Sequence, residues 1–177
     1  INIKIVSPNF DLKYDLNLNQ IEDRLKNLIK YSDPNRSKKT LFIWPEGAFS
    51  GYNYEEILIF KDLIKKNFNK NHYIIFGVNK LEKITGSYFN SLVLVNNKLN
   101  IIQQYNKQKL VPFGEFLPFE NLLNKFDLKK ITEGTGSFKK GSNQSNIKID
   151  QLNILPLICY EIIFTEFIQE ANFDTNL

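Results

Sequence analysis

The chain of 177 residues is 42% hydrophobic and 24% charged, which indicates one globular domain or part of one. It contains no apolar run of about 18 residues, so we predict no membrane span within it. Its first residues also lack the basic-then-apolar pattern of a secretory signal. One cysteine excludes an internal disulfide framework, and one cysteine with one histidine excludes a zinc cluster.

The net charge of +4 and the isoelectric point near 9.0 raise the question of a nucleic-acid partner. Arg24 and Arg36 are the only arginines, and the lysines are spread along the chain. Because bidentate recognition of bases and phosphates favours arginine, we expect no nucleic-acid partner.

The first half of the chain alternates strand patterns with helix patterns. Residues 1–7 alternate apolar and polar side chains, which predicts a strand, and residues 16–31 carry apolar side chains at helical spacing. Residues 40–44 form a continuous apolar run, typical of a strand buried on both faces. A second helix is predicted over 54–68 and a further strand over 73–78.

A hairpin and a long loop follow. Residues 90–95 and 99–105 have the pattern of two strands joined by a short turn. The stretch 106–146 is irregular, with one helix predicted near 119–126. Loops of this length inside compact domains are usually functional.

The chain ends with a predicted strand over 147–159 and a helix over 162–170. Together with the preceding elements, this order describes an α/β layered architecture with mixed sheets. Because neither an internal repeat nor a linker divides the chain, we expect one domain over residues 1–177. The chain begins at Ile1 and contains no methionine, so we expect it to be an incomplete piece of a longer protein.

Cys159 is the first candidate for chemistry. A lone cysteine in an apolar strand is usually a small buried hydrophobe. Glu161, however, follows two residues later and would share a face with the thiol if the strand continued. A carboxylate in so apolar a setting needs a partner, so the pair indicates the edge of a site.

A nucleophilic cysteine needs a base, which is usually a histidine. His72, the one histidine, is predicted to lie in a solvated turn, so a carboxylate is the better candidate. Glu46 follows the apolar run 40–44 and therefore lies at the carboxyl end of a buried strand, where open α/β sheets bind ligands. The alternative for Glu46 is an acid at the start of a helix, stabilised by the helix dipole.

Lys107 and Glu115 follow the predicted hairpin. A lysine after a strand is normally solvated, but in a site its charge would favour a thiolate and stabilise the oxyanion of a tetrahedral intermediate. Glu115 lies among prolines and aromatic residues, either in a loop packed on the core or in a rigid pocket wall that carries an acid. Gly136 and Gly141 have the spacing of a phosphate loop, but Ser142 stands where a lysine is required, which favours a surface loop.

Four segments in this order and spacing resemble the nitrilase superfamily of carbon–nitrogen hydrolases. They are Trp44-Pro-Glu46, Tyr105-Asn-Lys107, Leu110-Val-Pro-Phe-Gly-Glu115 and Ile158-Cys-Tyr-Glu161. The last two are characteristic of the bacterial apolipoprotein N-acyltransferase branch, which the chain resembles more narrowly.

The resemblance implies a four-layer αββα sandwich with mixed sheets, whose C-terminal part is missing here. It places the domain on the periplasmic side of the bacterial inner membrane, anchored by membrane segments outside this chain. It also implies transfer of a fatty acyl chain from a phospholipid to the N-terminal amino group of a diacylglyceryl-cysteine lipoprotein. No metal or organic cofactor is implied.

The same resemblance implies that Glu46 is the general base, that Lys107 stabilises the oxyanion and that Cys159 is the nucleophile, which forms a thioester. These three side chains are then expected to meet in one cleft.

Glu115 and Glu161 are implied to be supporting acids, and the backbone N–H of Tyr160 is implied to help bind the oxyanion. Two alternatives stay open. One is a soluble amidase that uses the same triad with water as the acceptor, and the other is a non-catalytic remnant.

Overall fold

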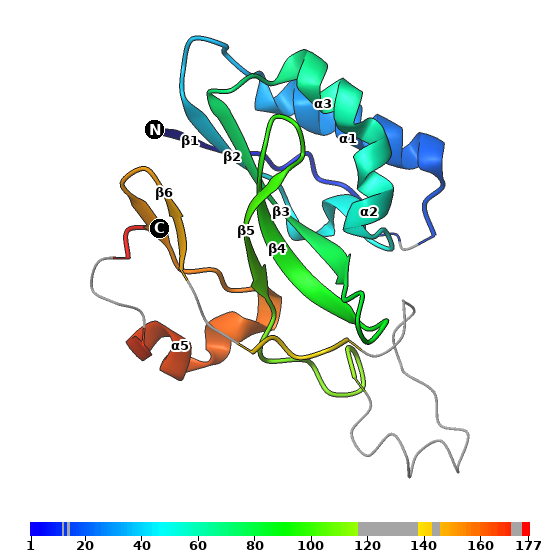
Figure 1. The fold of residues 1–177 in the computed structure, drawn as a ribbon, viewed down its shortest axis with the longest axis vertical. Helices are drawn as coiled ribbons and strands as arrows, with labels where there is room; N and C mark the ends of the chain where they lie inside the picture. Colours follow the sequence, from blue (N-terminus) through cyan, green and yellow to red (C-terminus); the bar gives the residue numbers. More distant parts are fainter. Residues whose placement is uncertain (12, 14, 117–137, 143–145, 171–174) are drawn as a thin grey trace.

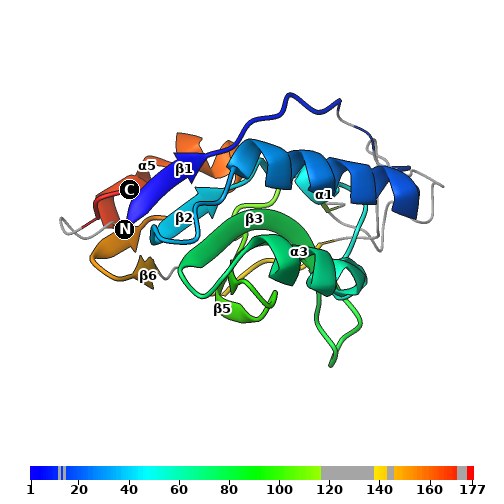
Figure 2. The same cartoon turned by 90° about the horizontal axis from the view of Figure 1, so that it is seen from above.

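The computed structural model of the chain describes residues 1–11, 13, 15–116, 138–142, 146–170 and 175–177. Figure 1 shows a central sheet with helices on one side and a small hairpin on the other. The view from above in Figure 2 shows the helical layer lying along the sheet.

The central sheet has the strand order β1-β2-β3-β4-β5. Its strands are β1 (Asn2–Ile5), β2 (Thr40–Ile43), β3 (His72–Leu81), β4 (Tyr88–Asn96) and β5 (Ile101–Asn106). The first three strands are parallel, whereas β4 is antiparallel to both β3 and β5, so the sheet is mixed as predicted. Because two reversals restore the direction, the carboxyl ends of β2, β3 and β5 lie at the same edge of the sheet.

Helix α1 (Leu18–Ser32) confirms the helix that the apolar spacing predicts. It begins with a capping box, in which Asn17 accepts a hydrogen bond from the Gln20 backbone and the Gln20 side chain accepts one from the Asn17 backbone. It ends at Asp33, which adopts a left-handed φ of 41°. Pro34 follows and cannot continue the helix.

The prediction of one continuous helix over 54–68 is wrong. The chain forms α2 (Tyr54–Ile57), a 3₁₀ turn, η2 (Leu58–Phe60), and then α3 (Lys61–Asn67). A 3₁₀ turn places apolar side chains at a spacing of three residues, close to the spacing in an α-helix. The hydrophobic pattern therefore does not reveal where one segment ends and the next begins.

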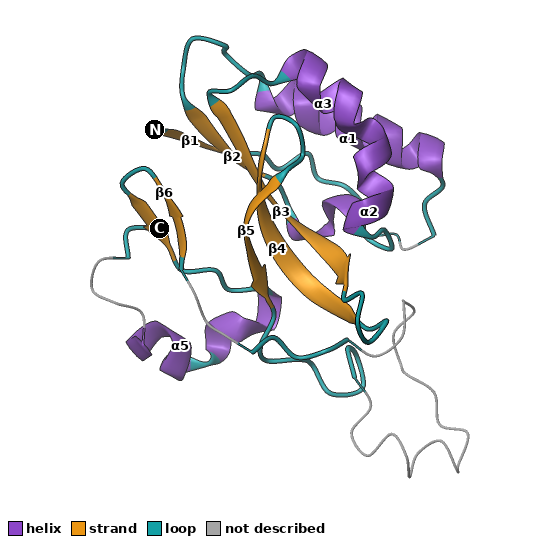
Figure 3. Ribbon diagram, in the orientation of Figure 1, coloured by secondary structure: helices purple, strands orange, loops and turns teal. Residues whose placement is uncertain are grey.

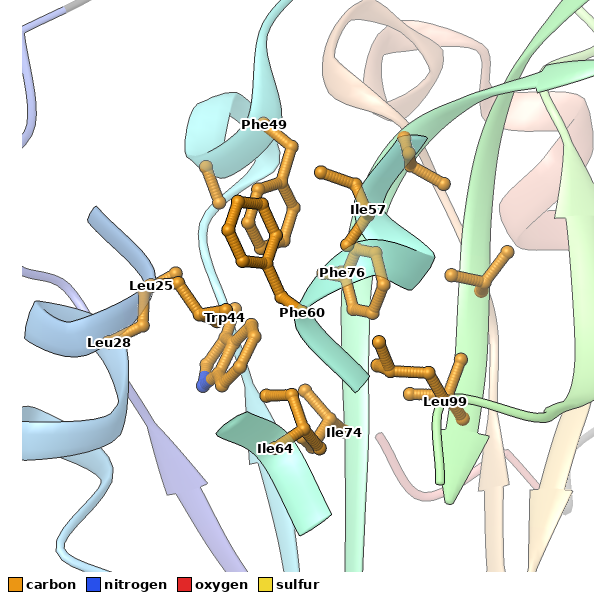
Figure 4. Packing of buried hydrophobic residues seen from close by; sticks show 14 of the residues in the cluster. Leu25, Leu28, Trp44, Phe49, Ile57, Phe60, Ile64, Ile74, Phe76 and Leu99 are labelled. Carbon is orange, nitrogen blue, oxygen red and sulfur yellow. The ribbon is translucent and has the colours of Figure 1, made fainter. Parts of the chain in front are cut away.

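The larger hydrophobic core lies between the helices and the sheet. Trp44, Phe49 and Phe76 lie at its centre, and Figure 4 shows them between α1, the α2–α3 segment and β3. Neighbouring rings among them are 5.2–6.1 Å apart between centroids, with tilted or edge-on geometry. This core fixes β2, and therefore fixes the residues that follow β2.

The second core lies on the opposite face of the sheet. There a two-stranded hairpin of β6 (Ile147–Ile149) and β7 (Leu152–Ile154) packs on side chains of the central sheet. Leu41, Ile75, Leu94 and Tyr105 are its buried members from the sheet. A helical layer, a sheet and a second, smaller sheet thus follow one another, as expected for an α/β sandwich.

The predicted strand over 147–159 is correct only in part. After the hairpin, the chain enters the 3₁₀ helix η4 (Cys159–Ile163) and then α5 (Thr165–Glu170). The strand does not continue through the thiol, so Cys159 and Glu161 do not share a strand face: Cys159 is exposed and Glu161 is fully buried. The apolar run before Cys159 reflects packing in the second core rather than pairing in a sheet.

His72 is buried at the start of β3, which contradicts the predicted solvated turn. Its ring packs edge-on against Phe42 and Phe68, at 5.5 and 5.7 Å between centroids. The Asn69 N–H donates to Nδ1, so Nε2 carries the proton and donates it to the Asn35 carbonyl. The imidazole therefore has a structural role at this position.

The helix predicted near 119–126 lies outside the described residues. Within the described part of the chain, no helix has both the length and the apolar character needed to cross a membrane.

The buried hydrogen bond from Trp44 Nε1 to Ser32 Oγ, 2.9 Å long, joins α1 to the segment after β2. We expect Ser32→Ala to lower the free energy of unfolding by about 1–3 kcal/mol, because the buried indole N–H loses its acceptor. Urea denaturation measures this change. Ser37→Ala, which removes an exposed hydroxyl, is the control and should stay within about 0.5 kcal/mol of wild type. An equal loss in both variants would contradict the role given to this bond.

Candidate active site

Two of the candidate residues lie at the edge where the parallel strands end. Glu46 opens the 3₁₀ helix η1 (Glu46–Phe49), which follows β2. Lys107 follows the last residue of β5, and its N–H donates to the Asn90 carbonyl over 2.8 Å. Strand direction therefore places at one edge of the sheet two residues that are distant in sequence.

The Lys107 side chain is buried, with a relative exposure of 2%, and does not extend into solvent. Its Nζ atom lies 3.0 Å from Oε1 of Glu115. The same Glu115 oxygen accepts a hydrogen bond from Asn90 Nδ2, and its Oε2 accepts one from the Val111 N–H. Both charges are compensated, as burial requires.

Glu46 lies within electrostatic reach of this pair. Burial among protein atoms raises the pKa of Glu46 above its ordinary value, and the Lys107 ammonium partly opposes this rise. The carboxylates of Glu115 and Glu161 raise the pKa further. One ammonium and three carboxyl groups therefore form a single electrostatic cluster at this edge.

Gly77 allows the backbone of Glu46 to approach β3 closely. A Cβ atom at position 77 would lie 3.1 Å from the Glu46 carbonyl oxygen and 3.5 Å from its Cγ. A larger residue there would displace the start of η1, so this glycine contributes to the position of the carboxylate.

Glu161 joins the segment that carries Cys159 to the loop that follows Lys107. Its Oε1 accepts hydrogen bonds from the Tyr105 hydroxyl (2.9 Å) and from the Gln108 and Lys109 N–H groups (2.7 and 3.0 Å). Its Oε2 accepts one from the Ile158 N–H, at 2.9 Å. The sequence predicts that the buried Glu161 carboxylate needs a partner, and these hydrogen-bond donors are that partner.

Cys159 begins η4 with a φ of 53°, a left-handed conformation that is uncommon for a residue other than glycine. Non-glycine residues in this region concentrate at functional sites, where the surrounding structure holds them. The thiol is exposed. Through the Glu161 contacts, this turn lies beside the loop after β5, and Figure 3 shows η4 at the end of that strand.

Tyr160 is exposed, and its ring lies edge-on to Phe164 at 5.1 Å between centroids. Its predicted contribution is the backbone N–H, and that role stays a prediction. Lys109 also contacts the Phe164 ring, with its Nζ 5.1 Å from the ring centre and 3.0 Å from the Glu166 carboxylate.

The structure brings Glu46, Lys107, Glu115 and Glu161 together and attaches the Cys159 turn to them. Their catalytic roles, the Glu46–Lys107–Cys159 triad included, remain predictions. In the described residues, no group of histidine, cysteine and carboxylate side chains could hold a metal ion.

Sequence reasoning missed the contribution of Asn90, whose carbonyl and side-chain amide hold Lys107 and Glu115, respectively. The feature of the sequence that could have indicated this role is the polar Asn90 side chain in an otherwise apolar strand. Tyr105 was part of a quoted motif, but its bond to Glu161 joins residues 56 positions apart.

The arrangement offers a thiol nucleophile, a carboxyl group with a raised pKa and a buried ammonium. A carboxylate with a raised pKa accepts a proton from a thiol more readily. A fixed ammonium stabilises the negative charge that develops on a carbonyl oxygen. These functions together suit acyl transfer through a covalent intermediate.

The family profile described as carbon-nitrogen hydrolase matches residues 11–171. The chain is similar to the apolipoprotein N-acyltransferase of Rhodopseudomonas palustris, with 30% identity over 97% of this chain and 34% of that protein. The protein of the same name from Wigglesworthia glossinidia brevipalpis is 32% identical over 95% of this chain and 34% of its own length. The chain thus spans about a third of the length of these curated relatives.

Two solved structures share the fold. The glutamine-dependent NAD+ synthetase from Acinetobacter baumannii gives a TM-score of 0.53 at 20% identity, over 84% of this chain and 27% of that one. Nit3 of Saccharomyces cerevisiae, a member of branch 10 of the nitrilase superfamily, gives 0.52 at 14% identity, over 93% and 57%. These likenesses, at such low identity, concern the fold alone, and that fold is the nitrilase-type α/β sandwich. Since the family match extends over residues 11–171, the chain belongs to the carbon–nitrogen hydrolase family.

Proposed function

We propose that this chain is the catalytic part of an N-acyltransferase that acylates lipoproteins. The acyl donor is a phospholipid, and the acceptor is the α-amino group of an N-terminal diacylglyceryl-cysteine. In this proposal the domain works on the periplasmic side of the bacterial inner membrane, held there by membrane segments outside this chain. No cofactor takes part.

The observation that supports the proposal is the network of charge and hydrogen bonds that joins Glu46, the Lys107–Glu115 pair and Glu161. The Lys107–Glu115 pair is linked to Glu46 through charge and to Cys159 through Glu161. The similarity to proteins named apolipoprotein N-acyltransferase over nearly the whole chain supports the choice of substrates.

The first half-reaction forms a thioester. The Cys159 sulfur attacks the ester carbonyl of the phospholipid while Glu46 takes the thiol proton. The resulting oxyanion is stabilised by the Lys107 ammonium and the Tyr160 N–H. When the carbon–oxygen bond breaks, Glu46 returns the proton to the leaving lysophospholipid, and the acyl group stays on the sulfur.

The second half-reaction forms the amide. The α-amino group of the lipoprotein attacks the thioester carbonyl, and Glu46 accepts a proton from the attacking nitrogen. The carbon–sulfur bond then breaks, and the proton passes to the departing sulfur. The thiol is restored, and the enzyme is ready for another phospholipid.

Cys159→Ser should abolish the acyl-thioester that forms on mixing the protein with phospholipid vesicles. The variant replaces the sulfur by an oxygen of similar size, so the fold is retained while the thioester cannot form. Mass spectrometry of the intact protein, with and without hydroxylamine, detects the adduct.

The acceptor is tested in the same assay. A diacylglyceryl-cysteine peptide should discharge the wild-type adduct and gain its acyl chain, whereas water alone should release little fatty acid. A normal amount of acyl adduct in Cys159→Ser would exclude Cys159 as the nucleophile. Discharge by water at an undiminished rate would assign the chain to the hydrolases.

Lys107→Ala should slow formation of the thioester by about two to three orders of magnitude, because loss of one preorganised oxyanion donor costs roughly 2.7–4 kcal/mol. Rapid-quench measurement of acyl-enzyme formation gives the rate. Lys98→Ala, at an exposed lysine in the β4–β5 turn, is the matched control and should keep the wild-type rate. Equal rates in the two variants would exclude the oxyanion role.

The pH dependence of kcat/KM should show an acidic limb above the pH at which an ordinary glutamate titrates. Glu46 acts as a base only when it is ionised, and its raised pKa keeps it protonated to a higher pH. Activity therefore falls as the pH drops through that raised pKa.

Glu46→Gln should remove this limb together with most of the activity. Asp62→Asn, on the exposed face of α3, should leave the limb unchanged. A limb in the ordinary glutamate range would argue against Glu46 as the base.

A further inference from the structure

Residues 138–142 cross the ends of β4 and β5 and form hydrogen bonds with the backbone of both Lys107 and Glu115. We call this segment the crossing segment; it is the yellow trace below those strands in Figure 1. The Phe138 N–H donates to the Glu115 carbonyl over 2.8 Å, and the Gly141 N–H donates to the Lys107 carbonyl over 2.8 Å. The Lys139 N–H donates to the Tyr88 carbonyl at 2.7 Å.

Gly141 is buried where the crossing segment meets the end of β5. A Cβ atom at this position would lie 2.2 Å from the Asn106 carbonyl oxygen and 2.8 Å from its carbonyl carbon, separations that real Cβ atoms essentially never show. The obstructing atoms belong to the backbone, so no side-chain rotation relieves the contact. Only glycine lets the two backbones approach this closely.

The requirement for glycine concerns space and not backbone conformation. Gly51 and Gly86 adopt positive φ angles, whereas Gly141 does not. Alanine could therefore adopt the backbone angles of Gly141, and the contact with Asn106 is the obstacle. Any side chain here must displace the crossing segment or the chain that carries Lys107.

We propose that Gly141 is a positioning residue for Lys107. The N–H of Gly141 and the absence of a side chain there let the crossing segment hold the Lys107 backbone. The Lys107 ammonium then reaches the reacting carbonyl. The Lys107 backbone is then held from both sides, because its N–H already donates to Asn90. This inference rests on the proposed function, in which Lys107 stabilises the oxyanion.

The Gly141→Ala variant, made in the natural protein, tests the proposal. We expect kcat/KM for acyl-enzyme formation to fall by about a hundredfold, because a misplacement of about 1 Å has an effect of that order. Ser142→Ala, at the next and exposed position, is the control and should retain the wild-type rate. A wild-type rate in Gly141→Ala would overturn the proposal.

A pH profile distinguishes loss of position from a general loss of structure. Glu46 is influenced by Lys107, Glu115 and Glu161, so a displaced ammonium changes the acidic limb of kcat/KM. Lys107→Met removes the charge and should move this limb to higher pH, and Gly141→Ala should move it in the same direction. An unmoved limb in folded Gly141→Ala would overturn the proposal, because damage elsewhere changes the amount of active protein and not the titration of Glu46.

Hydrogen exchange of the wild-type protein tests the same point without any variant. The Gly141 and Lys107 amides should both be protected and should open at similar rates, since both bonds hold the same backbone. A Gly141 amide that exchanges orders of magnitude faster than the Lys107 amide would overturn the proposal. If Lys107→Met leaves the rate unchanged, the proposed function fails; if only Gly141→Ala does so, the proposed function stands and this inference fails.

Discussion

A fully buried carboxylate fixes the relation between the two halves of the candidate site. Glu161 accepts hydrogen bonds from donors on both sides of it: Ile158 precedes it on its own segment, and Tyr105 belongs to β5. The Gln108 and Lys109 N–H groups extend this contact into the loop after Lys107. Because these donors are mostly backbone groups, the position of the Cys159 turn follows from the path of β5.

The energetics of this carboxylate support a positional role. A left-handed non-glycine residue such as Cys159 costs of the order of 1–3 kcal/mol. Hydrogen bonds to a charged group contribute about 1.5–3 kcal/mol each, from which the cost of burying the charge must be subtracted. Several such bonds next to the strained residue are therefore sufficient to hold it. The burial of Glu161 is explained by these hydrogen bonds alone, and its expected role as a supporting acid stays a prediction.

The charge balance of the site depends on Lys107. Its ammonium acts on Glu46, forms an ion pair with Glu115 and lies in a cluster that also contains Glu161. Burial and the other two carboxylates raise the pKa of Glu46, and Lys107 opposes them. A base that titrates closer to neutrality is a better proton acceptor for a thiol than an ordinary glutamate. In the proposed mechanism, the cation that would stabilise the oxyanion therefore also limits how far the pKa of Glu46 rises.

Sequence reasoning predicted the strands that lead to Glu46 and Lys107, because a continuous apolar run and a hairpin pattern depend on local spacing. It did not predict the turn at Cys159. The run before the thiol looks like a strand, but the Ile158 side chain packs in the second core while its N–H donates to Glu161. The burial of His72 was missed for a similar reason, since Phe42 lies 30 residues before it and only the folded sheet brings the rings together.

Close contact between two backbone segments is the feature of this structure that is hardest to predict from a single sequence. Nothing in the sequence shows that Gly77 and Gly141 lie against other backbone. A Cβ atom at Gly77 would meet the backbone of Glu46, and one at Gly141 would meet the backbone of Asn106, the neighbour of Lys107. The sequence favours a surface loop around Gly141, because Ser142 stands where a phosphate loop requires a lysine, and it does not reveal that Gly141 is buried against the end of a strand. In three dimensions Gly77 adjoins the backbone of Glu46, and Gly141 adjoins the backbone of Asn106 and Lys107. Close backbone packing from two separate segments therefore restrains the points from which the Glu46 and Lys107 side chains extend.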